Sequence, residues 1–392
     1  MSDSDTPREK AIRRQVSPLE LFFDLVFVFA VSQLAHHLVE HLTWRGAAET
    51  AVLLVAVFGT WAFTSFEATL LDITRPRTRF TVLAVMGLGL FMNAAISRAF
   101  AGSAWLFVVP LLLIMIGVQA LAAFGAPTKD MRRHYQRGLV WTATSAPLWV
   151  VGATQAPGPR LWWWAAAALI DLTGTWLAHP LPGRVLHSTH LDFDAEHMLE
   201  RLRLFLILLL GETVLTIGRT MAVVPVDAPA VLASAGVFVA LVSLWAVYFG
   251  GGEDVVAVHV ARTSDPIRSV RWGINVTYCA LAALVTVAVA SELVISHPLD
   301  QGSVRLALVL FGGPVLYLAS QAWYYHATTR QAWAQRLMAC AVCVPAAVAS
   351  LWLPSLVSLV LLDLILVTTA VVLSRAHRRL ADALRSADGA PA

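Results

Sequence analysis

The chain consists of long apolar stretches separated by short polar segments. The first stretch reads ELFFDLVFVFAVSQLAHH from Glu20 to His37 and holds the carboxylate of Asp24 inside an otherwise apolar run. About 20 predominantly apolar residues are enough to cross the hydrocarbon core of a bilayer as a helix. The pattern therefore predicts twelve transmembrane helices, at about 18–41, 47–71, 80–98, 103–124, 138–156, 161–180, 200–222, 228–250, 269–296, 304–326, 333–351 and 355–374.

Composition and charge agree with an all-α, polytopic membrane protein. The 392 residues are 58% hydrophobic and 14% charged, whereas soluble domains carry roughly 25% charged residues. Most of the 28 Lys and Arg residues fall in alternate connections, and the other connections hold at most one each. Because cytoplasmic loops are enriched in these residues, both termini are predicted to be cytoplasmic. The positive charge is thus a topology signal, and no nucleic-acid partner is predicted.

The longest inner connection, 181–199, divides the predicted helices six and six. ELFFDLVFVFAVSQ opens the first half and ERLRLFLILLLGET opens the second, and Trp61 would match Trp245. An even number of spans in each half predicts two parallel repeats, 18–180 and 200–374. Residues 1–17 form a predicted cytoplasmic N-terminal segment, and 375–392 a cytoplasmic tail.

Several ionisable side chains lie at predicted membrane depth, where they are costly and usually functional. Glu20 and Asp24 share one helix face through their i, i+4 spacing. The alternative for weaker polar groups is that they hold helices together through interhelical hydrogen bonds. The candidates for ion or solute binding are Asp24, Glu212, Glu20, Glu292, Glu67 and Asp171, and those for partners or gates are His197, Glu200, Arg201, Arg219, Arg271, Asn275 and Tyr278.

No metal or cofactor is predicted. His187, His190 and His197 lie in the long inner loop, where a solvated, pH-responsive loop is a commoner explanation than a metal site. Cys340 and Cys343 fit helix packing better than redox or metal chemistry. A phosphate-binding glycine loop of the GxxxxGK[ST] type does not occur in the sequence, which argues against an ATP-driven pump within this chain.

Two motifs resemble signatures of the bacterial low temperature requirement A (LtrA) family of membrane proteins. VSPLELFFDLVFVFAVSQLAHHL resembles its opening helix, and HMLERLRLFLILLLGETVLTIG its second signature. FEATLLDITR and YFGGGED depart from the family pattern. The resemblance implies a membrane fold but no established activity. The motif positions carried over are Glu20, Asp24, His197, Glu200, Arg201, Gly211, Glu212 and Glu292.

These observations favour a transporter or channel for a small solute or ion, with protons as a candidate coupling ion. Asp24 and Glu212 would be the matching carboxylates of the two repeats. One alternative is a membrane-embedded enzyme acting on a lipid or small metabolite through His36, His37 or the 187–197 loop. Another is a sensory or stress-response accessory protein. The predicted surroundings are the lipid bilayer of the bacterial inner membrane, and a homo-oligomer is a further candidate assembly.

Overall fold

A computed structural model describes residues 16–70, 75–125, 128–177, 179–181, 193–250 and 266–388. Long α-helices account for nearly all of this part of the chain, and an isolated β-bridge joins Gln301 and Pro354. The prediction of an all-α fold is therefore confirmed. The chain divides into two compact units, Met1–Leu208 with Asp265–Tyr278, and Leu209–Ser264 with Cys279–Ala392.

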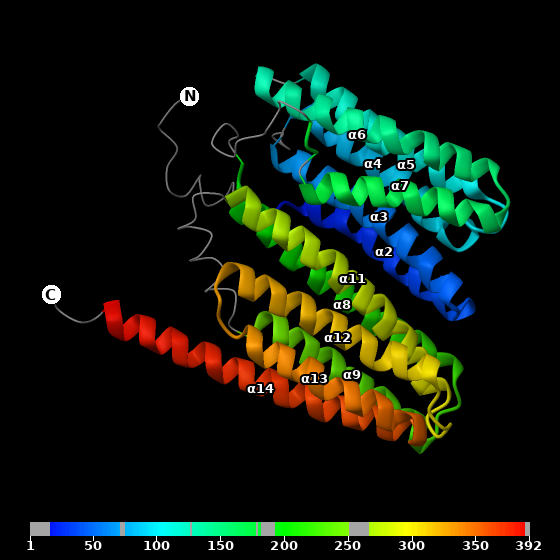
Figure 1. The fold of residues 1–392 in the computed structure, drawn as a ribbon, viewed down its shortest axis with the longest axis vertical. Coiled ribbons are helices and arrows are strands. Elements are labelled where there is room, and N and C mark those ends of the chain that lie inside the picture. The colour runs from blue at the N-terminus through cyan, green and yellow to red at the C-terminus, as the bar shows by residue number, and fades with distance from the viewer. Residues whose placement is uncertain are drawn as a thin grey trace. The chain divides into compact units, whose positions relative to one another are not determined.

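Figure 1 shows the helices of each unit. The first unit contains α2 (Pro18–Glu40), α3 (Trp44–Leu70), α4 (Pro76–Ala94), α5 (Ala104–Gly125), α6 (Lys129–Thr154) and α7 (Pro157–Leu177). The second contains α9 (Ala228–Phe249), α12 (Val304–Thr328), α13 (Trp333–Ala349) and α14 (Ser355–Asp388). Helices α8 (Ala195–Val223) and α11 (Pro266–Ser296) each contribute residues to both units.

Local sequence explains where several helices begin. Ser17 caps α2 in a reciprocal capping box with Glu20, and Pro18 occupies the first helical turn, where its missing N–H is not needed. Thr128, Asp227 and Ser303 accept hydrogen bonds from the backbone at the starts of α6, α9 and α12. The helices therefore begin at residues that satisfy the otherwise unpaired N–H groups.

Nine helices in the described part of the chain are long and apolar enough to cross a membrane, which establishes a multi-pass architecture. Helices α4, α6 and α7 coincide with the other three predicted spans but are less apolar. In α6 the reason is visible in the sequence, because its first turns carry Lys129, Asp130 and several arginines. The count of twelve spans, the repeats and the orientation of the termini stay predictions. Helix α14 continues to Asp388, well past the predicted end of the last span at 374.

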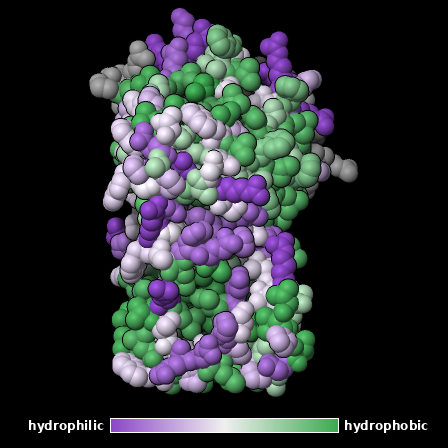
Figure 2. All heavy atoms as spheres, turned by 90° about the vertical axis from the view of Figure 1, so that its right-hand side faces the viewer, coloured by the Kyte–Doolittle hydropathy of each residue, from purple (hydrophilic) through white to green (hydrophobic). Residues whose placement is uncertain are grey.

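Large hydrophobic side chains cover much of the exterior, as expected for helices that face lipid. Trp44, Phe80, Phe124 and Trp162 are among those that are mostly exposed. Figure 2 shows broad hydrophobic areas beside hydrophilic patches on the face turned to the viewer. The bilayer is therefore the environment in which these surfaces are satisfied.

Within the first unit, α6 packs between α5 and α7, and α3 packs against α2 and α7. Within the second, α12 and α13 pair, and α14 packs against α9. Helix α12 contains the sequence GGP at 312–314 and runs through Pro314 without interruption. A Cβ at Gly313 would collide with Oγ1 of Thr286, so the glycine permits close approach of α12 to α11.

Candidate functional site

The beginning of α2 carries the first carboxylate of a buried charge network. Glu20 is 3% exposed, and its Oε2 accepts a hydrogen bond of 2.8 Å from the backbone N–H of Ser17. Its Oε1 lies 2.9 Å from Nε2 of His197, which is on α8. Glu20 therefore caps its own helix and also binds the beginning of α8.

Asp24 lies one turn further along α2 and is fully buried. Its Oδ1 accepts two hydrogen bonds, 2.8 Å from Nε1 of Trp61 on α3 and 2.9 Å from a terminal nitrogen of Arg201 on α8. Its Oδ2 has no hydrogen-bond partner among the described residues. Asp24 thus forms an ion pair with one oxygen and keeps the other open to a further donor.

Arg201 joins the two carboxylates, since its guanidinium also lies 3.7 Å from Oε1 of Glu20. The side chain is 1% exposed and lies 5.6 Å from the ring centroid of Phe23 and 5.8 Å from that of Trp61. Trp61 in turn stacks on Phe205 with 4.2 Å between ring centroids. Aromatic rings therefore surround a cation that has no access to water.

The network holds two carboxylates against one guanidinium and the His197 imidazole. The net charge of the network is zero when the imidazole carries a proton and −1 when it does not, so a single proton or small cation changes its balance. An isolated charge in a low-dielectric interior is very costly, so such a network favours the arrival of a compensating charge. Glu20 and Asp24, which the sequence singles out as candidates for ion or solute binding, thus lie in one buried charge network.

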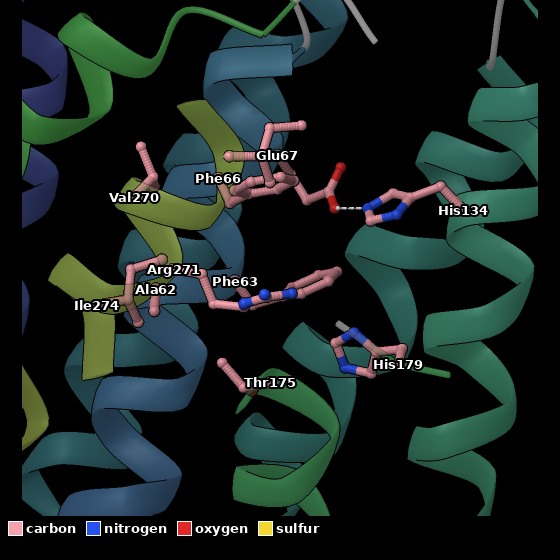
Figure 3. Close-up of a pocket in the computed structure, with 11 residues that line it drawn as sticks. Ala62, Phe63, Phe66, Glu67, His134, Thr175, His179, Val270, Arg271 and Ile274 are labelled. Carbon is pink, nitrogen blue, oxygen red and sulfur yellow. Dashed lines mark hydrogen bonds and ion pairs between the residues drawn. The ribbon is translucent and has the colours of Figure 1, made fainter. Parts of the chain in front are cut away.

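A second group of ionisable side chains lines a cavity of about 90 Å³ in the same unit. Figure 3 shows Glu67 and Phe63 on α3, His134 on α6 and Arg271 on α11 around it. The other lining residues are Ala62, Phe66, Thr175, His179, Ile267, Val270 and Ile274. The walls are thus mainly apolar, with a few polar groups from several helices, which is typical of a ligand site.

The hydrogen bonds beside this cavity have a fixed direction. Arg137 can only donate, so its contact of 3.4 Å makes Nδ1 of His134 an acceptor. The ring proton of neutral His134 is then on Nε2, which donates to Oε1 of Glu67 over 3.2 Å. Glu67 therefore acts as an acceptor, held in place by two residues of α6.

His179 lies just beyond the end of α7 and also lines the cavity. Burial, and then the positive charge of neighbouring Arg137, lowers the pKa of His179 to about 4. At pH 7 this imidazole is neutral and adds no charge to the cavity.

The structure places three other predicted site residues outside these two groups. Asp171 accepts a hydrogen bond of 2.9 Å from Nε1 of Trp149. Glu212 lies in the other unit from Asp24, and its contact is with Arg219 on the same helix, at 3.5 Å. Glu200 forms a similar contact of 3.5 Å with Arg203. The pairs of Glu212 and Glu200 lie within α8, and that of Asp171 joins the neighbouring helices α6 and α7.

The predicted site residues on α11 lie in different surroundings. Oδ1 of Asn275 is buried with no hydrogen-bond partner among the described residues. Tyr278 is buried and meets the ring of Phe58 edge-on, with centroids 4.4 Å apart. Glu292 is half-buried and belongs to the second unit. Of these residues, Arg271 lines the cavity.

Sequence reasoning missed Trp61 as a partner of Asp24, and missed His134 and Arg137 as partners of Glu67. The basic residues at 129–137 were used only to predict topology. The spacing of His134 and Arg137, three residues apart, is that of neighbours on one helix face and was the available signal. The described residues contain no group of three or more His, Cys, Asp or Glu side chains arranged to hold a metal ion. His187 and His190 lie outside the described residues.

Comparison with known proteins gives two matches. The family model of the bacterial low temperature requirement A protein (LtrA) matches residues 15–371. A Rhizobium meliloti (strain 1021) protein, named "uncharacterized protein RA0937", is 32% identical over 332 residues, which cover 82% of this chain and 80% of the relative. No solved structure matches the chain significantly.

Proposed function

The chain belongs to the bacterial low temperature requirement A (LtrA) family, and we propose that it moves a small solute or ion across the membrane. The observation that carries the proposal is the buried network in which Arg201 contacts both Glu20 and Asp24. Ionisable groups at membrane depth are costly, and they commonly mark pathways for protons, ions or substrates.

The open Oδ2 of Asp24 is the atom at which a proton or small cation would bind. Binding there weakens the attraction between Asp24 and Arg201, because the carboxylate loses its negative charge or shares it. Arg201 can then shift toward Glu20, which it already approaches at 3.7 Å. The network thus offers two arrangements of one cation between two carboxylates, as a coupled transport step requires.

The proposal includes the topology that the sequence predicts. Twelve spans with both termini cytoplasmic would place Glu20, Asp24, His197 and Arg201 toward the cytoplasmic side of the bacterial inner membrane. Two parallel repeats and a homo-oligomer are compatible with this arrangement and are proposed with it.

The test is flux in sealed proteoliposomes that contain a pH-sensitive dye, under an imposed proton or potassium gradient. Asp24→Asn is expected to abolish flux, and Asp24→Glu to retain part of it because the charge is kept. Asp300→Asn serves as the control, since Asp300 is an exposed residue paired only with His297 at 3.5 Å. Folding of each variant is checked by its elution profile and unfolding temperature.

A folded wild type that moves neither protons, potassium ions nor the amino acids named below would overturn the proposal. Flux that is equal in wild type and in folded Asp24→Asn would remove the network from the pathway. Glu212→Gln tests the predicted equivalence of the two carboxylates, because a matched pair would lose flux in both variants.

A further inference from the structure

We propose that the cavity lined by Glu67, His134 and Arg271 binds a small zwitterion, with its ammonium group on Glu67 and its anionic group on Arg271. The anionic group is a carboxylate or a phosphate. The zwitterion is the class of solute that the protein would transport. Its binding is argued from the cavity alone, and only its transport rests on the proposed function.

Glu67 supplies the acceptor for the ammonium group. Its side chain is 1% exposed, and Oε1 is already engaged by His134. Oε2 is buried without a hydrogen-bond partner among the described residues, and so is the neighbouring hydroxyl of Tyr135. Buried polar atoms are rarely left unsatisfied in native proteins. The Tyr135 hydroxyl lies beside Glu67 and can donate one hydrogen bond to it, and the carboxylate still has lone pairs for the ammonium group of a ligand.

Arg271 supplies the positive charge for the anionic group. Figure 3 shows its side chain extending from α11 into the cavity, with Glu67 and His134 to one side and Thr175 and His179 to the other. Among the described residues its guanidinium has no carboxylate within 4.0 Å and no hydrogen-bond acceptor, although it lines a mainly apolar space. A partly buried guanidinium without an anion favours an incoming carboxylate or phosphate, which it can bind through two parallel hydrogen bonds.

The charges of the cavity are complementary to a molecule with both signs. Glu67 accepts hydrogen bonds, Arg271 donates them, and His179 is neutral at pH 7. A ligand with a single charge would leave either the carboxylate or the guanidinium unpaired beside apolar walls, which is costly. A zwitterion satisfies both groups, and the rings of Phe63 and Phe66 suit the carbon atoms between its charges.

The size of the cavity limits the ligand. Its volume of about 90 Å³ is smaller than the ~150 Å³ apolar cavity that holds a benzene ring, so the enclosed part has about half a dozen heavy atoms. Small amino acids such as alanine and β-alanine have this size. The phosphoethanolamine headgroup of a phospholipid carries the same two charges and is the second source of this chemistry.

The test measures binding by titration calorimetry with the full chain in detergent. Alanine and β-alanine are the probes, and acetate and methylammonium are single-charge controls of similar size. Saturable binding of at least one amino acid is expected, with at least tenfold weaker binding in Glu67→Gln and in Arg271→Gln. Arg268→Gln is the matched control, because Arg268 is exposed on the same helix and does not line the cavity.

The lipid source is tested in a second arm. Native mass spectrometry counts phosphatidylethanolamine and phosphatidylglycerol molecules retained by the wild type and by Arg271→Gln. Selective, Arg271-dependent retention of phosphatidylethanolamine assigns the site to a headgroup, and amino-acid binding without such retention assigns it to a free solute.

The proposal is overturned if no amino acid binds and no phosphatidylethanolamine is selectively retained. It is also overturned if acetate or methylammonium binds as tightly, or if both folded cavity variants bind like the wild type. Binding that is lost in these variants while no solute crosses proteoliposomes would support the site and contradict the proposed transport. Proton or potassium flux without any zwitterion binding would support the proposed transport and contradict the zwitterion site.

Discussion

Among the described residues, Arg201 in the first unit and Arg336 in the second are the arginines with almost no exposed surface, and the two are stabilised in different ways. Arg201 in the first unit is paired with the carboxylates of Asp24 and Glu20. Arg336 in the second unit is 0% exposed and donates to the backbone carbonyls of Ala332 and Val247, at 2.8 and 3.4 Å. Its guanidinium carbon also lies 4.0 Å from the ring centroid of Tyr325.

The difference separates a responsive environment from a fixed one. Carboxylates can take up a proton or a cation, so the surroundings of Arg201 can change charge. Backbone carbonyls and an aromatic ring cannot, and the described residues place no carboxylate within 4.0 Å of Arg336. Burial of an arginine therefore does not by itself identify a functional site, and the identity of its partners decides.

The largest expected effect comes from removing one member of the charged pair. Asp24→Leu leaves Arg201 buried with only Glu20 at 3.7 Å, and we expect a loss of about 3–5 kcal/mol in the free energy of unfolding. Denaturant titration in lipid nanodiscs measures it. The double variant Asp24→Leu with Arg201→Met is expected to recover most of the loss, because no charge is then left unpaired. A double variant as unstable as the single one would contradict the ion pair.

A smaller loss in the free energy of unfolding is expected at Arg336, whose partners cannot change charge. Arg336→Met keeps the apolar stem and loses the contact with Tyr325, which is worth about 2 kcal/mol when desolvated. The same titration measures this loss, and flux through the folded protein should not change. A flux defect as large as that of Asp24→Asn would show that both arginines serve transport.

The smallest effect is expected from a hydrogen bond to the network. Trp61→Phe removes the 2.8 Å hydrogen bond to Asp24 but keeps an aromatic ring against Phe205. We therefore expect a loss of about 1.5 kcal/mol in the free energy of unfolding, the low end for a hydrogen bond to a charged group. Trp149→Phe removes the comparable 2.9 Å bond to Asp171 and is the matched control for stability. Only Trp61→Phe should alter the gradient dependence of flux. The same gradient dependence of flux in both variants would show that the hydrogen bond of Trp61 does not contribute to transport.

The sequence predicted the all-helical fold and its multi-pass character because their signal is local. Twenty apolar residues and a cap such as Ser17 define a helix without any knowledge of its neighbours. The prediction was less accurate at α6, which begins at Lys129 rather than near 138, because helical structure extends into charged residues beyond the apolar run.

The partners at the site were harder to predict, because they come from distant parts of the chain. The i, i+4 spacing places Glu20 and Asp24 on one face, but Trp61 and Arg201 reach Asp24 from 37 and 177 residues away. A single sequence contains no signal for such pairs. The predicted equivalence of Asp24 with Glu212 rested on similar apolar runs, whereas the structure surrounds the two carboxylates differently.

The separation of 37 and 177 residues also sets an order in time. At a synthesis rate of about 5–20 residues per second, Trp61 follows Asp24 within roughly 2–7 s, whereas Arg201 arrives after about 9–35 s. Trp61 is therefore available to Asp24 well before Arg201 has been synthesised, and the indole hydrogen bond can form earlier than the ion pair.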